Sequence, residues 1–150
     1  MTPRRTERPL TDVHFYHDAE DRVAAACHFA AKAWKAGRQV AVAAADPAER
    51  QRIDQWLWTA DPLAFIPHVA SSSPLAAQTP IQLGAPGDVW PHGDVLIHLG
   101  QDVPAEADHF AMVVEVVGRS EDERIPARQR WRAYQAAGHR LSAHGLGTRD

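Results

Sequence analysis

The stretches DVLIHL at 94–99 and AMVVEVV at 111–117 decide the fold class of this chain. Both are almost unbroken runs of apolar residues, a pattern typical of strands in a parallel sheet that is covered on both faces. Further strands are predicted at 12–16, 39–44 and 80–83. Apolar residues at helical spacing predict helices at 19–36, at 47–58 and from the end of the last strand to about 137.

This alternation of strands and helices, with short connections, predicts an α/β fold: a single three-layer, Rossmann-like domain with a mainly parallel sheet flanked by helices. The 150 residues suffice for one domain with a substantial core. We expect residues 1–11 to be a flexible lead-in, residues 12–144 to form the domain and residues 145–150 to be a flexible tail. Residues 69–79 are small and polar and are predicted to form a loop.

The composition predicts a globular domain without a membrane span, because 45% of the residues are hydrophobic, 23% are charged and no apolar run reaches membrane length. No apolar segment typical of an export signal follows Arg4 and Arg5. The single cysteine, Cys27, excludes an intramolecular disulfide and favours the reducing cytoplasm. It lies in an alanine-rich run, so a small buried side chain is a better interpretation than a catalytic nucleophile.

Positive charge is concentrated at the carboxyl end of the chain. Six arginines and one aspartate give residues 124–150 a net charge of +5, whereas the whole chain carries −3, which leaves −8 on residues 1–123. The body of the protein is therefore expected to repel nucleic acid, and its carboxyl end to attract anions. Trp131 lies among these arginines, which favours a small anionic and partly apolar ligand such as an acidic peptide end.

Motifs that carry catalysis or bind phosphate are missing from the sequence. The turn after the first strand reads HDAE at 17–20 instead of a glycine-rich loop, and neither G-x-x-x-x-G-K-[ST] nor G-x-S-x-G occurs. His14 and His17 are predicted on opposite faces of a strand, and His139 and His144 have no nearby carboxylate or thiol in the sequence. We interpret the histidines as polar surface residues, and we predict no catalytic residue, no metal and no cofactor.

Two charged residues fall in apolar surroundings. Glu115 lies inside the strand 111–117, where it either acts as a general base with a raised pKa or, as we favour, meets an arginine or faces solvent near a sheet end. Arg130 falls on the apolar side of the last helix, where it either extends its charge to solvent or pairs with a carboxylate.

The last helix gathers a candidate anion site on one side. At 100° per residue, the residues that fall together are Arg124, Arg128, Trp131 and Gln135, with Arg132 just beside them. A solvated charged face is the alternative interpretation for the arginines alone. A tryptophan exposed beside such charge favours a binding surface instead.

The sequence leaves two possible starts for this helix. The SEDE stretch at 120–123 matches a capping box, which places Pro126 in the second turn, where proline is unfavourable. A start near Ile125 instead places Pro126 at the first helical position. In that second case Arg124 precedes the helix, and the helical wheel does not set its direction.

A second candidate surface is predicted around Trp58, Phe65 and Pro67. One helix cannot bury both Trp56 and Trp58, because they lie about 200° apart around its axis. We therefore expect one of them in the core and the other in an exposed apolar patch with Phe65 and Pro67, of the kind that anchors protein interfaces. The alternative is that all of these aromatic residues belong to the core.

Five segments carry a resemblance to a known family: HFYH at 14–17, LWTADPLAFIPH at 57–68, DVLIHL at 94–99, VVEVV at 113–117 and RQRWRAYQAAGHRL at 128–141. Together they make the chain similar to the chi subunit of bacterial DNA polymerase III over roughly Val13 to His144. The resemblance implies a non-catalytic accessory subunit in DNA replication. Such subunits bind the psi subunit, which tethers them to the clamp loader. On another surface they bind the acidic C-terminal tail of single-stranded DNA-binding protein (SSB).

The resemblance also implies which residues make these contacts. For psi they are Trp58, Phe65 and Pro67. For the SSB tail, which ends in acidic residues and an apolar pair with a free carboxylate, they are Val117, Arg124, Arg128, Trp131 and Arg132. Pro126 departs from the family pattern, which bears on the position of Arg124. DNA is expected to be contacted only indirectly, and the chain is expected to be a monomer or a heterodimer with psi.

Two rival functions are compatible with the predicted fold. One is a nucleotide-binding enzyme, against which the missing glycine-rich turn counts. The other is direct binding of single-stranded DNA by the basic C-terminal helix, which would not require SSB.

Overall fold

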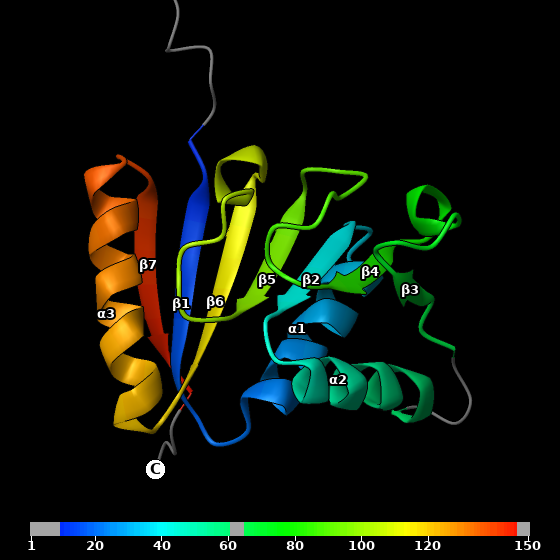
Figure 1. Ribbon diagram of the computed structural model, residues 1–150, viewed down its shortest axis with the longest axis horizontal. Helices are drawn as coiled ribbons and strands as arrows, with labels where there is room; N and C mark the ends of the chain where they lie inside the picture. Colours follow the sequence, from blue (N-terminus) through cyan, green and yellow to red (C-terminus); the bar gives the residue numbers. More distant parts are fainter. Residues whose placement is uncertain (1–9, 61–64, 147–150) are drawn as a thin grey trace, which may run out of the picture.

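The protein is an α/β sandwich built on a parallel sheet. The computed structural model describes residues 10–60 and 65–146, and within them seven strands pair in the order β3-β4-β2-β5-β6-β1-β7, all parallel (Figure 1). The strands are β1 (Asp12–Ala19), β2 (Val40–Ala44), β3 (His68–Ala70), β4 (Ile81–Gly84), β5 (Val95–Leu99), β6 (Met112–Gly118) and β7 (Arg140–Gly145). The predicted α/β class and parallel sheet are confirmed.

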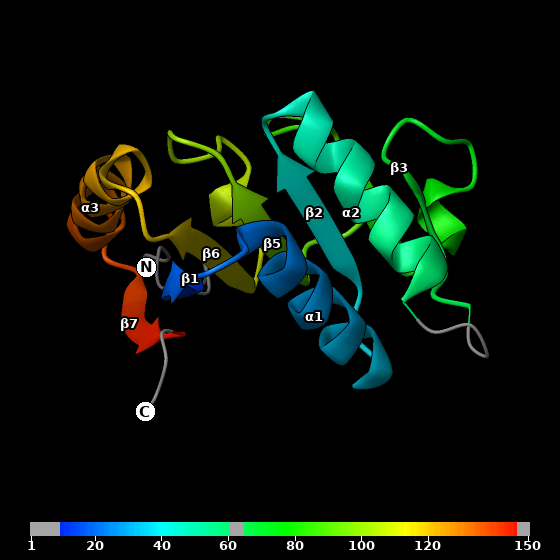
Figure 2. The same cartoon turned by 90° about the horizontal axis from the view of Figure 1, so that it is seen from below.

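Three α-helices cover the two faces of the sheet in the described part of the chain. They are α1 (Arg22–Lys35), α2 (Pro47–Thr59) and α3 (Glu121–Ala136), and two short 3-10 turns, η2 (Ala76–Gln78) and η3 (Ala107–His109), lie in the connections. Helices α1 and α2 pack on one face, whereas α3 packs on the other (Figure 2). None of these helices combines the length and the apolar character that crossing a membrane requires.

Local sequence signals explain where the helices begin and end. The Asp21 carboxylate accepts hydrogen bonds from the amides of Val23 and Ala24, which caps α1, and the Asp46 carboxylate caps α2 by accepting from the Ala48 amide. Gly37 and Gly138 follow α1 and α3 with φ values of +84° and +87°, a conformation that glycine adopts without steric penalty.

The alternation of side chains along the strands divides the core into two layers. Val40, Val42 and Ile97 point toward α1 and α2, whereas Val13 and Leu96 point toward α3. Nearly every residue of β2, β4, β5 and β6 is buried, which explains the unbroken apolar runs in the sequence.

Two strands were not predicted from the sequence. β3 has only three residues and lies at the start of the segment 69–79, which was predicted to be a loop. β7 follows α3 and pairs with β1 from Asp12 opposite Arg140 to His17 opposite Gly145, which is the first residue of the expected tail. Both are edge strands with partly exposed side chains, so neither has the apolar run that identifies the central strands.

Candidate partner-binding surfaces

The start of α3 settles which way its arginines point. The helix begins at Glu121 after Ser120, and Glu123 reaches back to accept a hydrogen bond from the Gly118 amide at 2.6 Å. Pro126 therefore lies inside the helix, and the start near Ile125 was wrong. The helix begins where the capping-box alternative placed it, although the Ser120 side chain makes no capping hydrogen bond. Proline offers no amide hydrogen, so one helical hydrogen bond is missing there. Arg124 belongs to the helix, and its direction follows the helical wheel.

A groove runs between α3 and the strands β1, β6 and β7. Its volume is about 340 Å³, and its lining includes all five residues expected to contact an SSB tail: Val117, Arg124, Arg128, Trp131 and Arg132. Four more lining residues, Phe15, His17, Ala127 and Ala143, were not predicted to line such a groove. Phe15, His17 and Ala143 lie on β1 and β7, and only the pairing of those strands brings them beside α3.

Trp131 forms an apolar wall of this groove. Its ring is half-buried and packs edge-on against Phe15, with 5.3 Å between the ring centroids. Val117 and Ala127 are buried residues beside it that also reach the groove. The indole is therefore neither enclosed in the core nor free in solvent, and an apolar group in the groove would meet an aromatic face.

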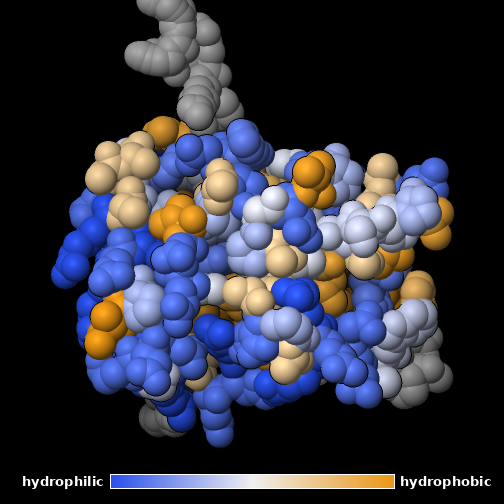
Figure 3. Space-filling model, viewed as in Figure 1, coloured by the Kyte–Doolittle hydropathy of each residue, from blue (hydrophilic) through white to orange (hydrophobic). Residues whose placement is uncertain are grey.

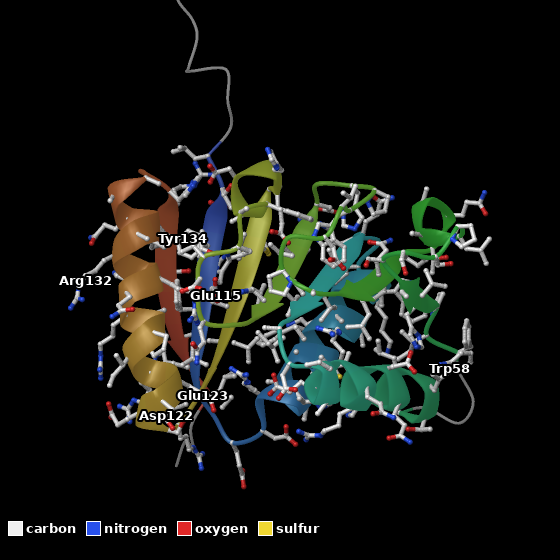
Figure 4. The ribbon with its side chains drawn as sticks, in the orientation of Figure 1. Trp58, Glu115, Asp122, Glu123, Arg132 and Tyr134 are labelled. Carbon is white, nitrogen blue, oxygen red and sulfur yellow. The ribbon has the colours of Figure 1, made fainter. Side chains whose placement is uncertain are left out.

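The guanidinium groups around the groove are exposed and weakly paired. Arg124 and Arg128 each lie 3.8 Å from the Glu121 carboxylate, with side chains 44% and 55% exposed. Arg132 has no ion pair with any described residue and points away from the sheet in Figure 4. Figure 3 shows mainly hydrophilic residues on the side of the molecule that α3 covers. The groove thus combines an apolar wall with cations that remain available to an anion.

The second candidate surface lies at the end of α2. The rings of Trp58 and Phe65 are 5.0 Å apart, and each residue is 56% exposed. Pro67 is partly buried, and the buried His68 lies beneath, 5.2 Å from the Trp58 ring. Residues 61–64 of this segment lie outside the described residues. The two predicted surfaces lie at opposite ends of the molecule, as Arg132 and Trp58 show in Figure 4.

The prediction that α2 would bury only one of its two tryptophans is confirmed. Trp56 packs against the core beneath α1 and α2, with its ring beside His28. Trp58 lies on the exposed side of the same helix. The alternative in which every aromatic residue of this segment belongs to the core was wrong.

Comparison with known proteins identifies the family. A family profile described as DNA polymerase III chi subunit, HolC, matches residues 10–142. The chain is 36% identical to the DNA polymerase III subunit chi of Pseudomonas aeruginosa over 141 residues, covering 91% of this chain and 98% of that protein. It is 32% identical to the Escherichia coli subunit chi over 123 residues, covering 77% of this chain and 80% of that one. This chain belongs to the DNA polymerase III chi subunit family. Members of the chi family are accessory subunits of the polymerase.

The inner side of α3 in this chi-family protein carries a buried polar network. The Arg130 Nε donates to Oε1 of Glu115 at 3.0 Å, the Tyr134 hydroxyl donates to Oε2 at 2.7 Å, and Nδ1 of His98 lies 2.8 Å from Oε1. Glu115 and His98 are fully buried, and Arg130 is 4% exposed. Figure 4 shows Glu115 and Tyr134 facing each other between the sheet and α3. Arg130 therefore pairs with a carboxylate, which was one of its two predicted roles.

The network decides the charge of Glu115. Burial alone would raise the pKa of its carboxyl group, but His98, Arg130 and Tyr134 outweigh burial and hold the pKa below its usual value of 4.5. A general base with a raised pKa was therefore the wrong alternative. Burial, together with the neighbouring Glu115 carboxylate, raises the pKa of Tyr134, so its hydroxyl remains a hydrogen-bond donor.

Several histidines differ from the prediction that they are polar surface residues. His68 and His98 are buried. His139 lies 2.9 Å from the Asp108 carboxylate, although no acidic residue is near it in the sequence. His14 meets His144 across β1 and β7, with their ring nitrogens 3.3 Å apart. No three histidine, cysteine or acidic side chains converge as metal ligands within residues 10–60 and 65–146.

Cys27 lies in the core beneath α1, as predicted for a small buried side chain. It is fully buried in the layer between α1 and the sheet. Burial raises the pKa of its thiol to about 12, so the reactive thiolate does not form near neutral pH. The alternative interpretation of Cys27 as a nucleophile was therefore wrong.

Proposed function

We propose that this chi-family protein bridges the clamp loader and SSB-coated DNA without catalysis of its own. Its groove along α3 binds the acidic C-terminal tail of SSB, and its Trp58–Phe65 patch binds the psi subunit. The observation that carries the first half is the convergence of all five expected residues on one groove with exposed guanidinium groups. The position of the patch at the opposite end of the molecule supports simultaneous binding of both partners.

The groove offers a separate partner for each part of an SSB tail. The terminal carboxylate accepts charge-assisted hydrogen bonds from Arg128 and a neighbouring arginine. The terminal apolar side chain packs against Trp131, Val117 and Phe15, which form the apolar wall. Acidic residues upstream need only a positive field, to which Arg132 contributes.

Glu121 competes with a bound peptide carboxylate for the arginines of the groove. Its carboxylate lies 3.8 Å from Arg124 and from Arg128, a distance too long for strong hydrogen bonds. These ion pairs are also exposed to solvent, which weakens them. A peptide carboxylate that approaches these guanidinium groups more closely displaces Glu121. Because a groove of about 340 Å³ covers only a few residues of a peptide, we expect affinity in the micromolar range and marked sensitivity to salt.

The experiment is a titration of the full chain into a labelled SSB-tail peptide, followed by fluorescence anisotropy. Arg128→Ala and Trp131→Ala should each weaken binding by about tenfold or more. Arg52→Ala, an exposed arginine on α2, is the matched control and should leave binding unchanged. A peptide with an amidated C-terminus should lose most of its affinity. Unchanged binding in both groove variants would reject this site.

The psi surface is tested with two further variants in a second binding assay. Phe65→Ala should weaken the complex with psi by about 1–3 kcal/mol, since large exposed aromatic residues are the usual anchors of interfaces. Val89→Ala removes another strongly exposed apolar side chain outside the patch and should have no effect. Peptide binding should be intact in both variants. Loss of both partners in Phe65→Ala would mean that the two surfaces are one.

Direct binding of single-stranded DNA is the outcome that separates this proposal from its rival. Residues 1–123 carry −8, so the body of the protein opposes a polyanion and leaves recruitment to the SSB tail. Labelled single-stranded DNA without SSB should therefore show no saturable binding at physiological salt. Tight binding of the DNA alone would favour the basic helix as a nucleic-acid surface.

A further inference from the structure

A crevice lies at the carboxyl ends of the central strands, apart from both surfaces described above. Its volume is about 810 Å³, and it is bordered by the segments that follow β2, β4 and β5. It shares no residue with the α3 groove. In Figure 1 these strand ends lie at the lower side of the sheet, where α1 and α3 begin.

The strand order makes this position a topological switch point. β2 and β5 are neighbours, but the chain leaves β2 toward β3 on one side of the sheet and leaves β5 toward β6 on the other. The connection after β2 continues into α2 on one face, whereas Ala107 and Phe110 of the connection after β5 pack on the opposite face. In parallel α/β sheets the diverging connections leave a crevice in which small ligands bind.

One buried polar atom at the crevice has no partner. His98 lines it and is fully buried, and its Nε2 makes no hydrogen bond with any described residue. Nδ1 of the same ring lies 2.8 Å from Glu115, whose carboxylate can only accept, so Nδ1 carries a hydrogen. Nε2 is then the ring nitrogen left without a partner, and an unpaired buried polar atom is unfavourable until a polar group reaches it.

Gly100 keeps the way to this atom open. A Cβ atom at position 100 would stand 2.6 Å from Nε2 of His98, and Gly100 itself borders the crevice. The missing side chain therefore leaves the imidazole nitrogen facing the crevice rather than a neighbouring methyl group. Any larger residue at this position would close the approach.

The remaining lining selects a class of ligand. Asp46 and Asp102 border the crevice with exposed carboxylates, so they add acceptors and negative charge. Arg22 is the one arginine or lysine among the described residues that line the crevice, and both oxygens of Glu49 already hold it at 2.8 Å. Phosphate is therefore disfavoured, and hydroxyl or amino donors are favoured. Apolar side chains, including Pro86, Val103 and Pro104, provide walls for a flat ring.

We propose that this crevice binds a ribonucleoside without its phosphate. The ribose hydroxyls or the base amino group donate to Asp46 and Asp102, a ribose hydroxyl pairs with the Nε2 atom of His98, and the base packs against the proline and valine walls. The inference does not rest on the proposed binding of SSB or psi.

The test is a titration of the full chain with adenosine, observed through the ring nitrogens of its histidines by NMR. Adenosine should move the Nε2 signal of His98 saturably, and AMP should bind at least about tenfold more weakly, because its phosphate meets two carboxylates. His98→Ala removes a buried partner of Glu115 and can unfold the protein, so the informative variant is Asp102→Arg in an exposed loop. It should weaken adenosine by about tenfold and favour AMP. Glu20→Arg makes the same charge change at an exposed position outside the crevice and should change neither affinity.

Three outcomes would overturn the proposal. Unchanged His98 signals at millimolar adenosine would mean that a buried water alone satisfies Nε2. Equal affinity for adenosine and AMP would contradict an acceptor-lined site. Binding that survives Asp102→Arg unchanged would place the ligand elsewhere on the protein.

Discussion

Arg130 and Arg132 lie two residues apart on α3 and have opposite environments. Arg130 is buried against the sheet and donates to Glu115, whereas Arg132 projects from the outer side of the helix with no ion pair to a described residue. The two side chains are chemically identical, and the helical turn of 200° between them separates their environments. The inner arginine is committed to the fold, and the outer one is available to a partner.

The same charge therefore has a different effect on stability in the two environments. A buried guanidinium must be paired with a carboxylate, because either charge alone would be uncompensated in a medium of low polarity. An exposed guanidinium is solvated, so its removal changes stability little. A basic stretch of sequence therefore mixes structural and recognition residues, and its net charge alone does not distinguish them.

The largest effect is expected from Arg130→Ala. Loss of the guanidinium leaves the Glu115 carboxylate buried without its cation, which should lower the free energy of unfolding by about 3–5 kcal/mol. Arg132→Ala is the matched control and should change it by no more than about 0.5 kcal/mol. Urea unfolding followed by circular dichroism measures both. Equally small losses of unfolding free energy in the two variants would contradict the difference between the two sides of α3.

Acid should break the ion pair between Arg130 and Glu115 without any mutation. Because the folded protein holds the pKa of Glu115 below 4.5, the ionised carboxylate contributes its full stability above that pH. The contribution is lost as the pH falls through the lower pKa of the folded state. Urea midpoints between pH 7 and pH 3 should decline in this range. A Glu115 carboxyl group that titrates above pH 4.5, as followed by carbon-13 NMR, would contradict the prediction.

A smaller loss is expected from Tyr134→Phe. The change removes one hydrogen bond at 2.7 Å to Oε2 of Glu115 but keeps the ring that packs against Phe15. We expect a loss of about 1–3 kcal/mol in the free energy of unfolding, because a buried acceptor loses its donor. Tyr16→Phe is a suitable control, since the Tyr16 ring packs against Phe29 and its hydroxyl makes no hydrogen bond with a described residue. Similar losses in both would show that ring substitution alone is responsible.

The smallest effect concerns the outer side of α3. Glu121→Gln removes the carboxylate that lies 3.8 Å from Arg124 and Arg128, so an SSB-tail peptide should bind about two- to threefold more tightly. Asp122→Asn makes a similar charge change one residue away, without these contacts. Anisotropy titrations at low salt should separate the two variants. An equal gain in both would mean that net charge, and not displacement of Glu121, governs the affinity.

Much of the fold and part of the candidate site followed from local patterns. The apolar runs that became β5 and β6 predicted central parallel strands, and the helical wheel placed Arg124, Arg128 and Trp131 on one side of α3. The edge strands β3 and β7 were missed, because their partly exposed residues carry no such run. Missing β7 also hid the contribution of Ala143 to the groove, and the contributions of Phe15 and His17 on β1 depend on a strand order that the sequence does not give.

By itself, the sequence determined the α/β class, the faces of the helices and the concentration of positive charge near the carboxyl end, because periodicity and composition act over a few neighbouring residues. Only the tertiary structure decided that Arg130 pairs with Glu115, that Trp58 and not Trp56 is exposed, and that His98 meets a crevice at the strand ends. These outcomes depend on which strands become neighbours. That choice is made by the packing of two core layers at once, and no local pattern encodes it.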